Sequence, residues 1–289
     1  MPDGVHFNRL AIFGVGLLGG AIGRKSKEIG LARHVIGIGR DRQRLESACA
    51  MGAIDEWTTD IQKGVTDCEL LILCVPVQKI IEYMPIVAKS VSSGTIVTDV
   101  GSTKKSIVET GKNLFHDNIF FVGSHPMTGS DKSGCLHSSE VAFKGVTCFV
   151  AVAPETDYAA AAKVALFWKA LGMIPVIIDP TRHDDYVALV SHVPHLVSAA
   201  LANAVSMCPE DLNFIRQICG KGFRDTTRLA MGDPPMWVEI FLENRQNIVN
   251  YLDGFIKMLA RIKAAINNGD KVEIENFFAS AKSFRKKFD

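Results

Sequence analysis

A glycine-rich motif directly follows an apolar run near the start of the chain. The run spans Arg9 to Phe13, and G-x-G-x-x-G follows from Gly14 through Gly16 to Gly19, ahead of a segment with helical character. A strand, this motif and a helix in succession are typical of the first turn of a dinucleotide-binding βαβ unit. Gly14 permits the tight turn, Gly16 leaves room for a pyrophosphate, and Gly19 allows close packing of the helix. A glycine-rich loop without a ligand is the alternative.

The end of the second expected strand bears on the choice of nicotinamide cofactor. That strand spans Val35 to Ile38, and Gly39 lies about twenty positions after Gly19, where a carboxylate usually binds the ribose 2′-hydroxyl. Arg40 follows instead, and a guanidinium suits a 2′-phosphate. The alternative is that the arginines here begin a solvated helix with Asp41 at its start. We favour NADP on this basis, and NAD stays open. The residues expected to contact the cofactor are Gly14, Gly16, Leu17, Leu18, Gly19, Gly39, Arg40, Asp41, Val75 and Ser102.

The composition is that of an ordinary globular protein. The 289 residues suffice for two domains, the net charge of +1 gives no reason to expect nucleic acid binding, and 47% of the residues are hydrophobic. No apolar run reaches the length needed to span a bilayer, so we expect no membrane partner. The seven cysteines include no C-x-x-C pair, which favours reduced thiols in a cytoplasmic protein.

The two halves of the chain differ in their expected secondary structure. In the first half, apolar strand-like runs alternate with helical segments, as in a doubly wound sheet. In the second half the strand pattern ends, and Thr181 to Met207 is a helical pattern interrupted by Pro194. We expect an α/β Rossmann-type nucleotide-binding domain in residues 1–180 and an all-α substrate-binding and dimerisation domain in residues 181–289. The later strands are expected at residues 69–75, 95–100, 119–122, 146–152 and 174–178.

Apolar residues in the second half recur at helical spacing. Asp233, followed by two prolines, predicts a helix start, and an apolar stripe extends from Phe241 to Ile262. This stripe exceeds what a small helical domain can bury by itself, so we expect a homodimer.

Four polar segments contain the side chains best able to do chemistry. They are residues 99–104, 123–134, 191–195 and 222–228. The first two follow expected strands, at the carboxyl ends where open α/β sheets bind ligands. The other two lie in the helical half, and a cleft between the halves would bring all four together.

These segments, in this order behind the nucleotide motif, resemble the prephenate/arogenate dehydrogenase family of tyrosine biosynthesis. The resemblance spans about Arg9 to Asn250 and includes Gly-Asp-Pro-Pro-Met-Trp at 232–237 and Glu-Asn-Arg at 243–245. It implies an NAD(P)-dependent oxidative decarboxylation of a small molecule, prephenate or arogenate or both. Hydride and carbon dioxide leave, and the ring becomes aromatic.

The resemblance also implies which residues are catalytic. His125 matches a histidine that draws off the substrate hydroxyl proton, and an imidazole with a pKa of about 6.5 suits that task. The alternative is a turn histidine held by Pro126. Ser102 matches a serine near the hydroxyl and the nicotinamide that orients His125, although by itself it would be taken as a helix N-cap.

A second set of residues is placed in the substrate pocket by the resemblance. Its members are Ser130, Asp131, His183, His195, Arg228 and Trp237. Arg228 matches an arginine that pairs with a substrate carboxylate, and Arg224 is a second candidate unless it lies on a solvated helix face. Trp237 would close the pocket, or pack in the core or the dimer interface. Asp131 stands where many family members have Glu, and either pairing with the arogenate ammonium or gating of access would suit it.

His192 and His195 have the H-x-x-H spacing found in some metal sites. Pro194 lies between them, no carboxylate is nearby in sequence, and zinc sites need at least three protein ligands. We therefore expect no metal, and His192 is better explained as a packed histidine.

Two other functions compete with this interpretation. Another two-domain dehydrogenase, of the β-hydroxyacid or pyrroline-carboxylate type, would carry a Lys-x-x-x-Asn-like pair or an unadorned helical pocket rather than Ser-His-Pro-Met-Thr-Gly. A nucleotide-sensing protein without catalysis fits poorly with the intact Ser102, His125 and Arg228.

Overall fold

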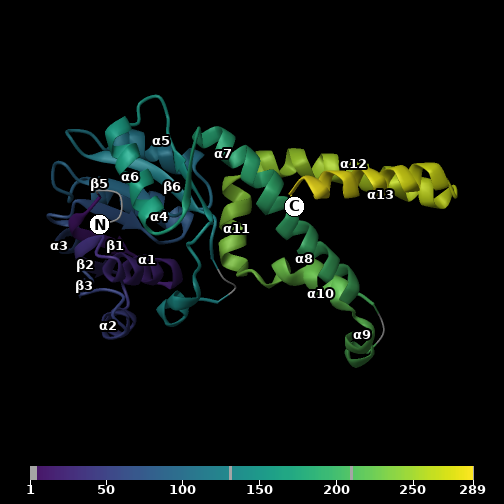
Figure 1. Ribbon diagram of the computed structural model, residues 1–289, viewed down its shortest axis with the longest axis horizontal. Coiled ribbons are helices and arrows are strands. Elements are labelled where there is room, and N and C mark those ends of the chain that lie inside the picture. The colour runs from purple at the N-terminus through teal and green to yellow at the C-terminus, as the bar shows by residue number, and fades with distance from the viewer. Residues whose placement is uncertain (1–4, 130–131, 209–210, 289) are drawn as a thin grey trace.

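An eight-stranded sheet organises the first half of the chain in the computed structural model, which describes residues 5–129, 132–208 and 211–288 (Figure 1). The strand order is β3-β2-β1-β4-β5-β6-β7-β8, and every neighbouring pair is parallel except β6 with β7. The strands are β1 (Phe7–Phe13), β2 (Ala32–Ile38), β3 (Glu56–Thr58), β4 (Leu70–Leu73), β5 (Ile96–Asp99), β6 (Phe120–Pro126), β7 (Thr147–Ala151) and β8 (Ile174–Ile178). The expected Rossmann-type arrangement is confirmed, and the short β3 was not predicted.

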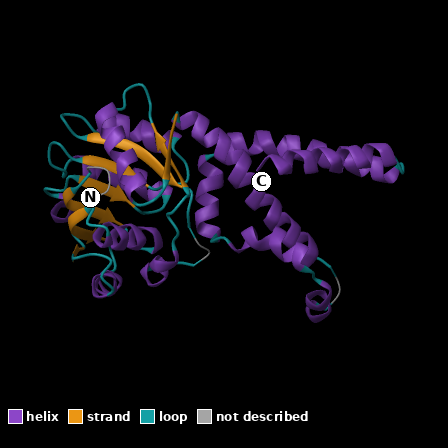
Figure 2. Ribbon diagram, in the orientation of Figure 1, coloured by secondary structure: helices purple, strands orange, loops and turns teal. Residues whose placement is uncertain are grey.

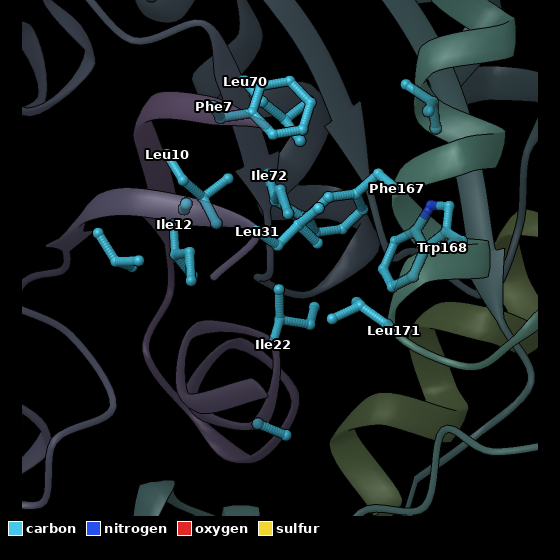
Figure 3. Packing of buried hydrophobic residues seen from close by; sticks show 14 of the residues in the cluster. Phe7, Leu10, Ile12, Ile22, Leu31, Leu70, Ile72, Phe167, Trp168 and Leu171 are labelled. Carbon is cyan, nitrogen blue, oxygen red and sulfur yellow. The ribbon is translucent and has the colours of Figure 1, made fainter. Parts of the chain in front are cut away.

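Helices cover both faces of this sheet, which is why its strands are continuous apolar runs. In β1, Leu10 and Ile12 pack into one core with Ile22 of α1 and Trp168 of α6, as Figure 3 shows. The alternate residues of β1 face a second core with α4 and α5. The helices of this half are α1 (Leu17–Glu28), α2 (Arg42–Ala50), α3 (Ile61–Val65), α4 (Val77–Ala88), α5 (Lys105–Leu114), the 3-10 helix η1 (Cys135–Glu140) and α6 (Tyr158–Ala170).

Strand β6 is longer than the expected 119–122. Its first residues pair in parallel with β5, and Gly123 to Pro126 then pair antiparallel with β7. His125 is therefore fixed inside a strand by its register with Phe149, and the alternative of a turn histidine is wrong. The sequence did not predict this longer strand, because a change of pairing partner within one strand produces no regular apolar pattern.

Every described residue after Pro180 lies in a helix or a connection (Figure 2). Helices α12 and α13 form an antiparallel pair that extends away from the sheet, and α11 lies between the sheet and α8 (Figure 1). The elements are α7 (Pro180–Val187), η2 (Ala188–His192), α8 (Val193–Ser206), α9 (Leu212–Ile218), α10 (Lys221–Thr227), η3 (Arg228–Met231), α11 (Pro234–Glu243), α12 (Arg245–Asn267), α13 (Lys271–Arg285) and η4 (Lys286–Phe288). The predicted helix start at Asp233 is confirmed as the N-cap of α11.

The helical pattern was expected to be interrupted at Pro194, but the helix continues through this residue. A π-helical turn, η2, precedes it, and the N–H of Val193 bonds to the carbonyl of Ala188. This wider turn accommodates the missing N–H of proline, so α7, η2 and α8 run on as one helix.

In the described part of the chain, one helix is long and apolar enough to cross a membrane by length and composition alone. It spans Pro180–Ser206, with 27 residues and a mean hydropathy of 1.3 over its most apolar window. The expectation that no apolar run reaches that length therefore does not hold for this helix, which continues through Pro194. The first turns of this helix hold His183 and Asp184 buried against the sheet domain.

Candidate active site

The glycine motif has the geometry expected of a nucleotide-binding turn. Gly14 has a φ of +100°, and a Cβ there would lie 2.4 Å from the carbonyl oxygen of Cys74. A Cβ on Gly19 would lie 2.1 Å from the carbonyl oxygen of Gly14, so α1 needs glycine to pack this closely. Gly16 differs, since no atom lies within 4 Å of its Cβ position. This open space faces an α1 N-terminus that has no side-chain cap, which suits a phosphate.

The remaining cofactor candidates lie around the same turn. Leu17 and Leu18 form the first turn of α1, and their backbone N–H groups belong to its uncapped end. Val75, after β4, reaches within 2.8 Å of the Cβ position of Gly14. The strand ends that carry these residues all meet at one edge of the sheet.

At the end of β2, the arginines have different partners. Asp41 caps α2 through the N–H of Arg44 at 3.1 Å and pairs with the Arg44 guanidinium, as the helix-start alternative proposed. Arg42 pairs with Glu46. Among the described residues Arg40 has no hydrogen-bond or ion-pair partner, which leaves its guanidinium open to a ligand.

His125 is held from behind by a second histidine. Its Nδ1 lies 2.9 Å from Nε2 of His183, and Nδ1 of His183 lies 2.8 Å from Oδ1 of Asp184. The Asp184 carboxylate also accepts the backbone N–H groups of Lys104 at 2.7 Å and Lys105 at 2.9 Å. A carboxylate from the helical half thus caps α5 of the sheet domain and holds the histidine pair.

This arrangement corrects two expectations about neighbouring residues. His183 is fully buried, and both of its ring nitrogens are occupied, so it does not line a substrate pocket. Ser102 is not the N-cap of α5, which is Lys104, and the Nδ1 of His125 is held by His183. Ser102 precedes α5 at the same sheet edge, and its contact with substrate and nicotinamide stays a prediction.

A buried ion pair supports the strand that carries His125. Lys104 and Asp99 are both fully buried and form a salt bridge. The other oxygen of Asp99 accepts the backbone N–H of Ser124 at 3.0 Å, and the hydroxyl groups of Thr98 and Ser124 lie 2.7 Å apart. These contacts join β5 to β6 immediately before His125, so the catalytic candidate lies on a rigid element.

Burial and neighbouring cations favour the neutral form of the histidines. Burial, then His183 and Lys104, hold the pKa of His125 well below its usual 6.5. Burial also lowers the pKa of His183, although Asp184 opposes the shift. Burial lowers the pKa of His192 to about 4. A neutral His125 can accept a proton at physiological pH.

His195, Trp237 and Arg228 lie together at the helical side of the site. The ring centroids of His195 and Trp237 lie 3.9 Å apart with the ring planes tilted by 33°, and both residues line a cavity of about 280 Å³. Arg228 is exposed, has no carboxylate partner among the described residues, and its charge contributes to lowering the pKa of His195. An unpaired guanidinium beside an aromatic cavity is suited to an anionic ring substrate.

The H-x-x-H pair points to separate partners. Nδ1 of His192 faces the amide of Asn244 at 3.2 Å, whereas Nδ1 of His195 donates to the carbonyl of Ser191 at 2.9 Å. In the residues that the structure describes, no three His, Cys, Asp or Glu side chains are grouped to hold a metal ion. His192 is fully packed, as expected.

Some candidate functional residues were not predicted from the sequence, and some predicted ones lie outside the described residues. Asp184, Asn244 and the buried Lys104 were not predicted as functional residues, although Asn244 belongs to the Glu-Asn-Arg motif and Lys104 to the polar segment 99–104. Their roles depend on contacts between residues about sixty positions or more apart, for which the sequence gives no spacing pattern. Ser130 and Asp131 lie outside the described residues.

Comparison with known proteins identifies the family. Residues 22–177 match the family model described as "Prephenate dehydrogenase, nucleotide-binding domain", and residues 179–280 match "Prephenate dehydrogenase, dimerization domain". The chain is 28% identical to a prephenate dehydrogenase of Bacillus subtilis over 96% of this chain and 75% of the relative. It is 30% identical to a cyclohexadienyl dehydrogenase of Zymomonas mobilis over 96% of this chain and 95% of the relative.

A solved structure agrees over nearly the whole chain. The prephenate dehydrogenase from A. aeolicus, in complex with hydroxyphenyl propionate and NAD+, superposes with a TM-score of 0.89 and 29% identity. The match covers 99% of this chain and 100% of that one. The glycine turn at Gly14 to Gly19, the buried pair of His125 and His183, and Arg228 beside the aromatic cavity agree with these matches. The matches show that the chain belongs to the prephenate dehydrogenase family.

Proposed function

We propose that the protein catalyses the nicotinamide-dependent oxidative decarboxylation of prephenate, arogenate or both, in tyrosine biosynthesis. The observation that carries the proposal is the position of His125. It is a neutral, strand-held histidine at the same sheet edge as an open nucleotide-binding turn. The Ser-His-Pro-Met-Thr-Gly segment and the family matches favour this reaction over a β-hydroxyacid oxidation.

The residues present fit a nicotinamide dinucleotide. Gly16 leaves space beside the uncapped N-terminus of α1, where Leu17 and Leu18 offer backbone N–H groups to the pyrophosphate. When bound, the cofactor supplies the group that accepts the hydride from the ring carbon bearing the hydroxyl group. The NAD+ in the A. aeolicus relative supports this class of cofactor.

His125 moves a single proton in the proposed reaction. As the hydride leaves the ring carbon, the hydroxyl gives its proton to Nε2 of His125 and the carbon–oxygen double bond forms. The bond between the ring and its carboxylate then breaks, carbon dioxide departs, and the electron pair enters the ring. The ring becomes aromatic as a phenolate, and His125 returns the proton to its oxygen, so no net proton is lost.

Arg228 and His195 hold the substrate in this proposal. The unpaired Arg228 guanidinium would bind a substrate carboxylate by two parallel hydrogen bonds. His195 donates its Nδ1–H to the carbonyl of Ser191, which leaves a bare Nε2 to accept a hydrogen bond from the substrate, with Trp237 against its ring face. Prephenate and arogenate differ in a keto group and an ammonium group, and Asp131 is the residue we propose to test for that distinction.

We further propose that NADP is accepted at least as well as NAD. Support comes from Gly39, which offers no carboxylate, and from Arg40, which has no partner among the described residues. Asp41 is engaged as the N-cap of α2. The Gly39→Asp variant should raise the KM for NADP while sparing that for NAD, and Arg40→Ala should affect NADP alone. Equal effects on both cofactors, or none, would overturn this proposal.

The assembly is proposed to be a cytoplasmic homodimer built on a helical domain of residues 181–289, after a nucleotide-binding domain of residues 1–180. Among the described residues of the helical half, the packed core cluster is small, with Ala188, Val193 and Ile248 at its centre. Large apolar side chains are exposed there instead. Examples are Leu242, Ile256, Leu259 and Phe278. Only 28% of the apolar window in Pro180–Ser206 is buried, and a partner would cover such surface. The cytoplasm suits the seven free cysteines.

The experiment that tests the function is a matrix of substrates and cofactors. Purified protein is incubated with prephenate or arogenate and with NAD+ or NADP+, and absorbance at 340 nm is followed. We expect turnover with at least one combination of substrate and cofactor. A 3-hydroxyacid is tested in parallel as the comparison substrate. Turnover of the 3-hydroxyacid alone would favour the competing dehydrogenase class, and nucleotide binding without turnover would favour a sensing protein.

A further inference from the structure

The contacts behind His125 determine which of its nitrogens carries a proton. The three groups form a chain in which Asp184 bonds His183, and His183 bonds His125, at 2.8 and 2.9 Å. Both oxygens of Asp184 already accept hydrogen bonds from the backbone N–H groups of Lys104 and Lys105. An ionised carboxylate only accepts, so Nδ1 of His183 must be the donor.

The remaining assignments follow in order along the chain. A neutral His183 protonated at Nδ1 has a bare Nε2, which must accept from Nδ1 of His125. A neutral His125 protonated at Nδ1 then has a bare Nε2. That nitrogen has no hydrogen-bond partner among the described residues, so it is the one left to accept from a substrate hydroxyl. The opposite order of protons would leave Nδ1 of His183 bare, facing an Asp184 oxygen with no proton between the two acceptors. It would also place the proton of neutral His125 on Nε2, which could then not accept the substrate proton.

We propose that Asp184 is a positioning residue that sets the tautomer of His125 through His183. Asp184 does not touch the substrate, because it lies behind His183 and is itself buried. Its effect is carried by two imidazoles in series, whereas in a Ser-His-Asp triad the carboxylate orients the catalytic histidine directly. This inference rests on the proposed role of His125 as the base.

A buried amide fixes Asp184 in turn. The side-chain amide of Asn244 donates to the backbone carbonyl of Asp184 at 2.6 Å and faces Nδ1 of His192 at 3.2 Å. Its oxygen accepts from Asn247 at 2.9 Å, so its hydrogen-bonding groups are all used. Asn244 lies between α11 and α12, and it therefore links the position of Asp184 to the packing of the helical half.

The first test is spectroscopic and uses the wild-type protein without substrate. The full-length protein is labelled with 15N-histidine, and long-range 1H–15N spectra distinguish the two neutral tautomers. The His125 signals are identified by their loss in His125→Asn. We expect His125 and His183 both protonated at Nδ1 and bare at Nε2. A proton on Nε2 of His125 overturns the inference, whether or not the enzyme turns over prephenate.

The second test compares two neighbouring carboxylates. Asp184→Asn should lower kcat by between about 10-fold and 10⁴-fold, with KM for substrate and cofactor within about twofold. Asp185→Asn is the matched control, because Asp185 is adjacent in sequence but accepts from Tyr251 at 2.9 Å and has no contact with the histidine pair. A kcat of Asp184→Asn equal to that of Asp185→Asn overturns the inference. If Asp184→Asn does not fold, the wild-type tautomer decides the question. Wild-type protein with the expected tautomer but no turnover would instead refute the proposed function.

Discussion

Substituting His125 with asparagine removes the side chain proposed to take the hydroxyl proton. General-base removal typically costs about 10²–10⁴ in rate, so kcat should fall by that factor. Affinity for the nicotinamide cofactor should be unchanged, because the cofactor turn lies on β1 and α1. Steady-state kinetics and cofactor titration check both expectations. His116→Asn is the control, since His116 is exposed and bonds only its local backbone. A His125→Asn enzyme with near-normal kcat would contradict the assignment.

The environment of His125 also predicts how activity depends on pH. Burial, His183 and Lys104 lower the pKa of His125 well below 6.5, and the base is active only when neutral. Depression of the pKa therefore shifts the loss of activity to lower pH. The kcat should stay level as the pH falls from 8 to about 6.5 and decline only below that value. Circular dichroism must show a folded protein throughout. An acid limb centred at or above pH 6.5 would contradict this environment.

Some single residues could be interpreted from the sequence and others could not. Gly14, Gly16 and Gly19 were predicted with their separate functions, because each function follows from the absence of a Cβ at a known place in the motif. His183 was placed in the substrate pocket, whereas the structure buries it behind His125. A motif identifies a residue near a site, but which side of the catalytic group it occupies depends on tertiary packing.

The turn between β1 and α1 gives a prediction with an internal comparison. Gly16→Ala adds a methyl group where no protein atom lies within 4 Å, in the space proposed for the pyrophosphate. Cofactor affinity should fall at least about tenfold, a loss of about 1.4 kcal/mol, with little change in the Tm of the free protein. Gly19→Ala should instead lower the Tm, because its Cβ would meet the Gly14 carbonyl at 2.1 Å. Titration calorimetry and thermal unfolding separate the two effects. A Gly16→Ala protein that binds cofactor normally would refute the proposed position of the pyrophosphate.

Secondary structure was predictable wherever one pattern persisted along an element. Strands β4, β5 and β7 were expected close to their observed bounds, because strands buried in a sheet are continuous apolar runs. Strand β8 was also expected at its observed bounds from its apolar sequence, although it lies at the edge of the sheet and is largely exposed. Two features of the secondary structure were not predicted, for a shared reason. The change of partner within β6 and the π-helical turn before Pro194 are both set by neighbouring elements rather than by local sequence.

Carboxylates of the helical half lie at the N-termini of two sheet-domain helices. Asp184 accepts from the first N–H groups of α5, and Glu239 accepts from the N–H of Gln78 in α4 at 3.3 Å. Glu243 adds contacts with Gln78 and Ser106 at 3.1 and 2.8 Å. The two halves are therefore joined by polar contacts directly beside the proposed site, which keeps His125 and the helical pocket in register.

The whole molecule is expected to be a homodimer. Sedimentation equilibrium at micromolar concentration should give twice the 31.5 kDa of one chain, because a single chain leaves many large apolar side chains of the helical half exposed. Enzymatic activity should follow the dimer on dilution. A catalytically competent monomer at micromolar concentration would contradict this expectation.

Release of carbon dioxide distinguishes the proposed reaction from every simple hydroxyl oxidation on a similar fold. The substrate, prephenate or arogenate, is labelled with 13C at its ring carboxylate, and labelled carbon dioxide and NAD(P)H are measured in the same reaction. We predict one carbon dioxide for each NAD(P)H, because hydride transfer and loss of the carboxylate occur in the same molecule. NAD(P)H formed without labelled carbon dioxide, or no turnover of either substrate, would contradict the proposed function.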